Sequence, residues 1–187
     1  GDWSSDVCSS DLGYVYIGMD HFALPDDELA AALRQGSLQR NFQGYSTFAD
    51  CDLLALGVTG ISHIGNTYCQ NEKDIERYSR RLSEDELPLL QGVVIDHDDQ
   101  IRKEVIRQLM CHFELNYAEI DERFKIDFRQ YFETELARLG GFADDGLVQF
   151  TERGLTVTSS GRFLIRNVAM VFDRYLQRRT EIGRAHV

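Results

Sequence analysis

Apolar and polar positions change their period near the middle of the chain. Residues 13–22 alternate aromatic and aliphatic side chains and turn polar at Asp20 and His21, which predicts a strand with a polar C-terminal end. Residues 25–36 begin with acidic side chains and end in glycine, as an amphipathic helix does. Residues 52–64 form a short, glycine-interrupted apolar run, which is typical of a buried parallel strand. The first half is therefore predicted to be α/β.

The second half is predicted to be mainly helical. A helix should begin near Asp96, because Ile101, Val105 and Leu109 recur at helical spacing. A second apolar helix face should end at the glycine pair 140–141, and it contains Phe124, Phe128, Tyr131, Phe132, Leu136 and Leu139. The aromatic residues of this face recur at the spacing of a packed core. We therefore interpret them as core residues and not as a cofactor site.

A β-hairpin is predicted after these helices, from residues 147–150 and 155–158. One of the hydroxyl residues at 158–160 should cap a last helix. Helices, a hairpin and a further helix resemble a winged-helix arrangement, whose usual role is DNA binding. We interpret the segment as a structural cap, because the chain carries a net charge of −11 and phosphate binding requires basic surfaces.

The composition also argues against other classes of protein. There is no apolar run of about 18 residues and no signal-peptide pattern, so we expect a soluble, cytoplasmic protein that binds neither membrane nor nucleic acid. Cys51, Cys69 and Cys111 are too widely spaced for a disulfide framework or a CxxC metal site.

The two ends of the chain are expected to be artefacts. Residues 1–12 (GDWSSDVCSSDL) and 181–187 (EIGRAHV) can be back-translated, with permitted codons, into paired sequencing-adapter sequences. We therefore predict that residues 13–180 are an internal piece of a gene, and we leave the ends out of the fold.

Candidate ligand-binding groups lie in two places. The segment 38–47 has no clean period and could grip a flat, polar, anionic ligand through one cation, two amides and two aromatic walls, namely Arg40, Asn41, Gln43, Phe42 and Tyr45. Its alternative interpretation is a surface loop with both aromatic rings packed inward. Asp20 and His21 could face a ligand crevice at the end of a strand, or they could serve as a turn cap and a structural histidine.

Four blocks carry a family resemblance. GMDHFA (18–23), RNFQGYST (40–47), DLLALGVTGIS (52–62) and RNVAMVFDRYL (166–176) occur in the order found in the oxygen-independent coproporphyrinogen III oxidases, which are radical SAM enzymes. The chain resembles this family over nearly all of residues 13–180. Related haem-chaperone-type proteins, which have no oxidase activity, usually carry a different block in place of RNFQGY. They remain the alternative.

The resemblance implies a fold, a reaction and cofactors. Residues 13–94 would be the terminal strands and helices of a partial TIM-type radical SAM barrel, and residues 95–180 a helical, winged-helix-like cap. The family, which we expect to be monomeric, decarboxylates coproporphyrinogen III oxidatively to protoporphyrinogen IX in haem biosynthesis, with a 4Fe-4S cluster and S-adenosylmethionine.

The resemblance also assigns site residues. It implies that Gly60 and Ile61 contact S-adenosylmethionine, although Thr59-Gly60 departs slightly from the serine or alanine of the family. The substrate-binding candidates are Asp20, His21, Arg40, Asn41, Gln43 and Tyr45. The CxxxCxxC cluster motif does not occur in this sequence, so we expect this polypeptide alone to be inactive.

Overall fold

The computed structural model describes residues 12–48 and 51–176. The predicted adapter segments 1–12 and 181–187 thus lie outside the described residues, apart from Leu12. The chain divides into two compact units. Described residues up to 48 and from 101 onward form the first unit, and residues 51–100 form the second. Across the described ranges, every helix is too short or too polar to cross a bilayer.

The first unit begins with two small hairpins around one helix. Strands β1 (Val15–Gly18) and β2 (His21–Ala23) pair antiparallel. The predicted single strand over 13–22 is therefore wrong, because the chain reverses at Met19, whose φ is +53°. Strands β3 (Gln39–Asn41) and β4 (Gly44–Ser46) also pair antiparallel.

Helix α2 lies between these hairpins and confirms the predicted helix that ends at Gly36. It spans Glu28–Gln35. The side chain of Asp27 accepts a hydrogen bond of 2.8 Å from the amide of Leu29. Gly36 closes the helix with a φ of +70°, a conformation that costs glycine little.

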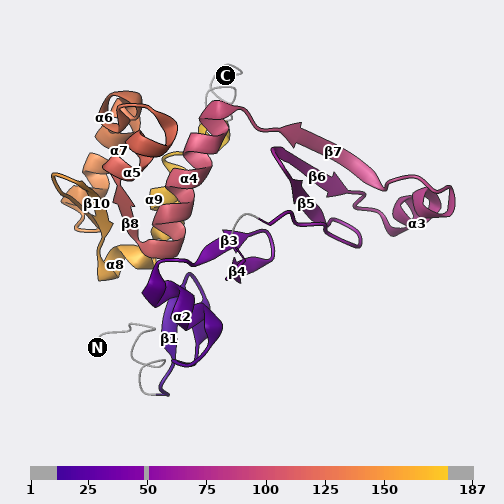
Figure 1. Cartoon of the computed structure of the whole chain (residues 1–187), viewed down its shortest axis with the longest axis horizontal. Coiled ribbons are helices and arrows are strands. Elements are labelled where there is room, and N and C mark those ends of the chain that lie inside the picture. Colours follow the sequence, from indigo (N-terminus) through magenta and orange to yellow (C-terminus); the bar gives the residue numbers. More distant parts are fainter. Residues whose placement is uncertain (1–11, 49–50, 177–187) are drawn as a thin grey trace, which may run out of the picture. The chain divides into compact units, whose positions relative to one another are not determined.

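The C-terminal part of the first unit is a helical core with a small sheet. Figure 1 shows the shorter helices gathered beside the long helix α4 (His97–His112). They are α5 (Tyr117–Phe124), α6 (Phe128–Tyr131) and α7 (Glu133–Asp144). The predicted stripe of Ile101, Val105 and Leu109 is confirmed, since all three are fully buried. The predicted break at residues 140–141 is wrong, because a helical glycine costs only about 1 kcal/mol and Leu139 packs into the core.

The small sheet confirms the predicted hairpin and adds a strand. Strands β8 (Glu114–Asn116), β9 (Val148–Phe150) and β10 (Gly154–Val157) are antiparallel in the order β8-β10-β9. Thr158 then caps α8 (Ser159–Arg162), accepting from the amide of Gly161 at 3.1 Å, and α9 (Ile165–Met170) follows. The cap was predicted, whereas β8 was not.

The second unit is an antiparallel sheet with one helix. Strands β5 (Ile61–Ile64), β6 (Thr67–Asn71) and β7 (Leu89–Val94) lie in that order, and α3 (Ile75–Ser83) connects β6 to β7 (Figure 1). The predicted buried parallel strand over 52–64 is wrong. Leu54 and Leu56 are 70% and 85% exposed, and the chain turns at Gly57 and Thr59, whose φ values are positive.

Helix α4 contributes to two separate cores of the first unit. Its buried stripe joins a large cluster that includes Phe128, Phe132 and Phe172. Cys111, on another face of α4, packs with Ile17 and Leu38 in a smaller cluster. The same helix thus holds the helical core on one face and the two N-terminal hairpins on another. The mixed α/β character predicted for the chain is confirmed.

Candidate functional site

Two candidate side chains, His21 and Arg40, lie around the ring of Tyr45 in the first unit. The Tyr45 hydroxyl donates a hydrogen bond of 3.0 Å to the carbonyl oxygen of Met110 on α4. The His21 ring meets the Tyr45 ring edge-on, with 5.1 Å between centroids. Arg40, the cross-strand partner of Tyr45, places its guanidinium carbon 5.6 Å from the ring centroid. Tyr45 is therefore a platform that links a histidine and a cation to the helical core.

Glycine at position 18 permits this close packing. A Cβ atom added there would overlap the Tyr45 hydroxyl and lie 2.8 Å from its Cζ atom. The φ of Gly18 is +154°, which also disfavours other residues. In the GMDHF block, position 18 therefore requires a glycine, in addition to the polar side chains that the block supplies.

Asp20 and His21 lie beside each other at the tip of the first hairpin. The Nδ1 atom of His21 is 3.1 Å from Oδ1 of Asp20. The Asp20 side chain is 87% exposed and that of His21 is 41% exposed. On the other side of the ring, a Cβ at Gly44 would lie 3.4 Å from Nε2 of His21. Glycine at this position therefore keeps one edge of the imidazole open.

The two candidate amides lie at the turn of the second hairpin. The Oδ1 atom of Asn41 accepts a hydrogen bond of 2.8 Å from the backbone amide of Gln43, which shapes the turn. Within the described residues, the side-chain amide nitrogens of Asn41 and Gln43 make no hydrogen bond. Phe42 is 59% exposed, so only Tyr45 of the two aromatic residues packs inward.

Burial controls the ionisation of the groups beneath the platform. Burial raises the pKa of the Tyr45 hydroxyl well above its usual range, Cys111 raises it further, and Arg40 opposes this. The hydroxyl therefore stays protonated and remains a donor. Burial likewise raises the pKa of the Cys111 thiol to about 11. A protonated, fully buried thiol is neither a nucleophile nor a metal ligand at neutral pH.

Gly60 and Ile61 belong to a well-anchored loop of the second unit. The Ser62 hydroxyl accepts from the amide of Ala55 at 3.0 Å, and the Asn71 side chain donates to the carbonyl of Ala55 at 3.2 Å. A Cβ at Gly60 would lie 3.1 Å from that of Ala55, so a glycine fits the turn best. Ile61 is half-buried and starts β5.

The described residues do not supply ligands for an iron–sulfur cluster. Cys51 is exposed, Cys69 lies in β6, and Cys111 is buried among apolar side chains. Within the described ranges, the one group of three side chains close enough to hold a metal ion comprises Asp96, Asp98 and Asp99. Asp96 and Asp99 accept from each other's backbone amides at 2.9 and 3.1 Å, which caps α4.

Sequence reasoning missed the helix side of the site. Met110 and Cys111 support Tyr45 and the first hairpin, yet they follow the predicted stripe on α4 and stand more than sixty residues from the loop. The one available signal was that α4 carries apolar residues outside its stripe. Periodicity can show such a second face, but it cannot name the partner of that face.

Residues 95–164 match the model of the HemN C-terminal domain family. A solved structure described as coproporphyrinogen III oxidase (HemN) from Escherichia coli, a radical SAM enzyme, superposes with a TM-score of 0.87 at 47% identity. The match covers 91% of this chain and 39% of that one.

Curated relatives agree with the domain match. The oxygen-independent coproporphyrinogen III oxidase of Pseudomonas aeruginosa is 53% identical over 164 residues, which is 88% of this chain and 36% of the relative. The Escherichia coli protein of the same name is 48% identical over 170 residues, which is 91% of this chain and 37% of the relative. The predicted resemblance is confirmed. The chain spans little more than a third of the length of these relatives.

Proposed function

We propose that the chain is the C-terminal part of an oxygen-independent coproporphyrinogen III oxidase. The whole enzyme would convert coproporphyrinogen III to protoporphyrinogen IX by oxidative decarboxylation in haem biosynthesis, as a cytoplasmic monomer. The observation that carries this proposal is the 53% identity, over 164 residues, to an enzyme of that name. An identity this high over most of the chain favours a shared function as well as a shared fold.

Arg40 is proposed to bind a propionate carboxylate of the substrate. It is exposed, and a guanidinium recognises a carboxylate through paired hydrogen bonds. Tyr45 is proposed to hold the guanidinium in place, since its own hydroxyl is anchored on Met110. The turn amides of Asn41 and Gln43 would add neutral donors to a second carboxylate oxygen.

Asp20 and His21 are proposed to complete the substrate site. Asp20 lies on the Nδ1 side of the imidazole, with Oδ1 3.1 Å from that nitrogen. Nε2 is then left for a polar group of the substrate, on the side that Gly44 keeps open. His21 from the first hairpin and Arg40 from the second would therefore engage one ligand together.

The cofactors of the family, a 4Fe-4S cluster and S-adenosylmethionine, need binding residues in the complete enzyme. The thiols of the described residues do not fit a 4Fe-4S cluster, so we propose that its ligands belong to a part of the enzyme outside this chain. Gly60 and Ile61 are proposed to contact S-adenosylmethionine in that complete enzyme. The isolated chain is accordingly expected to have no oxidase activity.

The finer fold assignment is also a proposal. Residues 13–94 would complete a partial TIM-type barrel, and residues 95–180 would form a winged-helix-like cap. Exposed apolar side chains support the first part, because Leu54, Leu56 and Val94 are all more than 60% exposed and would be covered in a complete barrel. The order of α4, β8, the three helices α5 to α7 and the β9–β10 hairpin supports the second.

A chimaeric enzyme tests the proposal. Residues 13–176 would replace the matching segment of the Escherichia coli enzyme, and the conversion of coproporphyrinogen III would be followed anaerobically. We expect turnover, and we expect Arg40→Gln to lower kcat/KM about tenfold or more, as the loss of a charge-assisted hydrogen bond does. Arg166→Gln, an exposed arginine on α9, is the matched control and should leave turnover unchanged.

The alternative is a haem-chaperone-type relative. In that case the chimaera would fold and retain its cluster absorbance but would not turn over coproporphyrinogen III. Haem would bind, and Arg40→Gln would not alter that binding. This result would contradict the oxidase proposal.

A further inference from the structure

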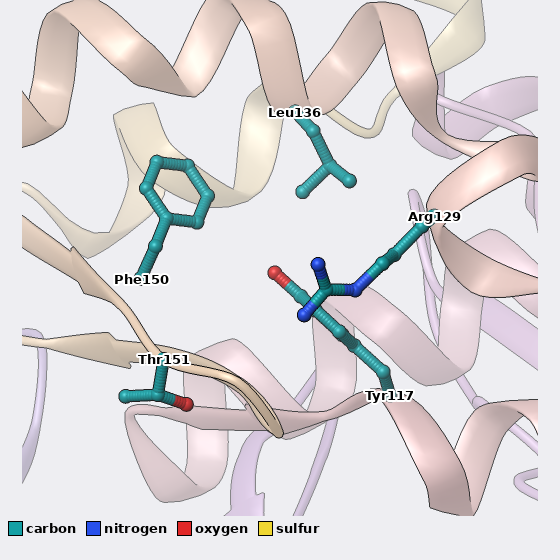
Figure 2. Close-up of a pocket in the computed structure, with 5 residues that line it drawn as sticks. All are labelled: Tyr117, Arg129, Leu136, Phe150 and Thr151. Carbon is teal, nitrogen blue, oxygen red and sulfur yellow. The ribbon is translucent and has the colours of Figure 1, made fainter.

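A pocket in the C-terminal part of the first unit has two chemically different sides. It has a volume of about 290 Å³ and is lined by Tyr117, Arg129, Leu136, Phe150 and Thr151. Figure 2 shows Phe150 across the space from the Arg129 guanidinium, with the Tyr117 hydroxyl pointing into the space and Leu136 along another edge of it. Its volume is close to the lower limit of small-molecule sites.

The polar side is preorganised by contacts with the protein. The Nη2 atom of Arg129 donates to the carbonyl oxygen of Glu152 at 2.8 Å, and the guanidinium carbon lies 5.4 Å from the Tyr117 ring centroid. The Tyr117 ring is stacked on Phe128, with 4.5 Å between centroids. These contacts fix the direction in which both polar groups point, so an arriving ligand would not need to order them.

Both polar groups retain donors for a ligand. Within the described ranges, Arg129 makes no hydrogen bond other than the one to Glu152, so its Nε and Nη1 groups are available. The Tyr117 hydroxyl makes none in the same part of the chain. Burial raises the pKa of that hydroxyl, which therefore stays a hydrogen-bond donor at neutral pH. Hydrogen-bond donors beside one positive charge favour an anionic acceptor.

The remaining lining favours an apolar group. Phe150 projects from β9 with 44% of its surface exposed, and Leu136 lies on α7. The Thr151 hydroxyl is already engaged in the turn, where it accepts from the amide of Gly154 at 3.0 Å. It therefore adds little polarity to the wall.

We propose that this pocket binds a small apolar carboxylate. The carboxylate would accept from Arg129 and Tyr117, and an aryl or alkyl group would pack against Phe150 and Leu136. The site lies among residues of the C-terminal domain and uses none of the groups proposed to bind coproporphyrinogen III, so it does not depend on the proposed function. The ligand could be a free acid or the C-terminal carboxylate of a polypeptide.

Binding of 3-phenylpropionate to the complete 187-residue chain tests the proposal, followed by saturation-transfer NMR. Two matched ligands separate the two sides of the pocket, 3-phenylpropanol without the charge and acetate without the ring. Arg129→Gln removes the charge of the pocket, and Arg138→Gln is the control, an exposed arginine on α7 that does not line it. Tyr117→Phe removes only the hydroxyl.

We expect saturable binding of 3-phenylpropionate, with both matched ligands binding about tenfold more weakly or worse. Arg129→Gln should weaken binding to a similar extent, and Arg138→Gln should not change it. Absence of saturable binding, equal binding of the alcohol or of acetate, or equal effects of the two arginine variants would overturn the proposal. The comparison of ligands on the unmodified chain stands even if a variant fails to fold.

A tripeptide that ends in phenylalanine distinguishes the two sources of the carboxylate. If it binds more tightly than 3-phenylpropionate and its C-terminal amide does not bind, the site recognises a polypeptide end. If it binds more weakly, the site recognises a free acid.

Discussion

Substitution of Gly18 by alanine would disturb the platform on which the candidate site rests. The added Cβ would overlap the Tyr45 hydroxyl and lie 2.8 Å from its Cζ atom. Tyr45 cannot swing away at little cost, because its hydroxyl is bonded to Met110 and its ring packs against His21. We therefore expect Gly18→Ala to break the link between the second hairpin and α4.

The magnitude follows from two contributions. A non-glycine residue at the φ of Gly18, +154°, costs about 1–3 kcal/mol. Loss of the hydrogen bond from Tyr45 to Met110 costs about 1 kcal/mol more. The free energy of unfolding should therefore fall by roughly 2–4 kcal/mol. Gly36→Ala is the matched control, because its φ is also positive but no atom lies within 4 Å of the added Cβ.

Urea unfolding of the 187-residue chain, followed by far-ultraviolet circular dichroism, measures both variants. The same substitution in a Tyr45→Ala background tests the cause directly. There the clash is gone, and Gly18→Ala should cost about 1 kcal/mol less than in the unmodified chain. The reasoning is refuted if Gly18→Ala costs no more than Gly36→Ala and its cost is the same in both backgrounds.

Three further predictions concern the helical part of the first unit. Thr158→Ala should lower the free energy of unfolding by about 1 kcal/mol in the urea assay, because the hydroxyl caps α8 through the amide of Gly161, and an unchanged value would contradict the cap. Glu135→Gln should lower the free energy of unfolding by roughly 1.5–3 kcal/mol, because it removes the carboxylate charge 2.8 Å from the Arg102 guanidinium. A double-mutant cycle that combines Glu135→Gln with Arg102→Met should show that the two substitutions are strongly coupled. Additive effects on the free energy of unfolding would contradict a stabilising ion pair. Burial lowers the pKa of His112, so the unfolded chain binds more protons than the folded chain. The free energy of unfolding should therefore fall as pH drops below about 6.5. His112→Gln should flatten that pH dependence in urea titrations from about pH 5 to 7.

The helices were predictable where local chemistry decides them. Asp27 and Gly36 mark both ends of α2 by capping rules that depend on nearby backbone groups alone. The N-terminal hairpins were missed, because their turns lack the Asn-Gly or Asp-Gly signature and contain Met19 and Phe42 instead. Resolving them would have required knowledge of the partner strands.

The prediction of a buried parallel strand over residues 52–64 was wrong for a different reason. An apolar sequence predicts burial, but it does not say what covers the side chain. Leu54 and Leu56 are exposed in this chain, while Ala55 is buried within the same loop. If the proposal of a partial barrel holds, the pattern reflects a surface that the complete enzyme covers.

The sequence allowed several residues of the site to be chosen, but it did not show how they pack together. Arg40 and Tyr45 could be chosen from composition, and their pairing across one hairpin brings them together. The support from Met110 could not be found, because no local pattern connects a loop to a helix so distant in sequence. Gly18 was visible in the GMDHF block, but its steric role depends on the tyrosine that packs over it.

The coding sequence upstream of Gly13, recovered from the same source DNA, tests the central claim most directly. If the chain is the C-terminal part of a radical SAM oxidase, the upstream sequence will encode a CxxxCxxC cluster motif in the same reading frame. A reading frame that starts close to Gly13 without this motif would contradict the claim, and a binding role without radical chemistry would then explain the chain better.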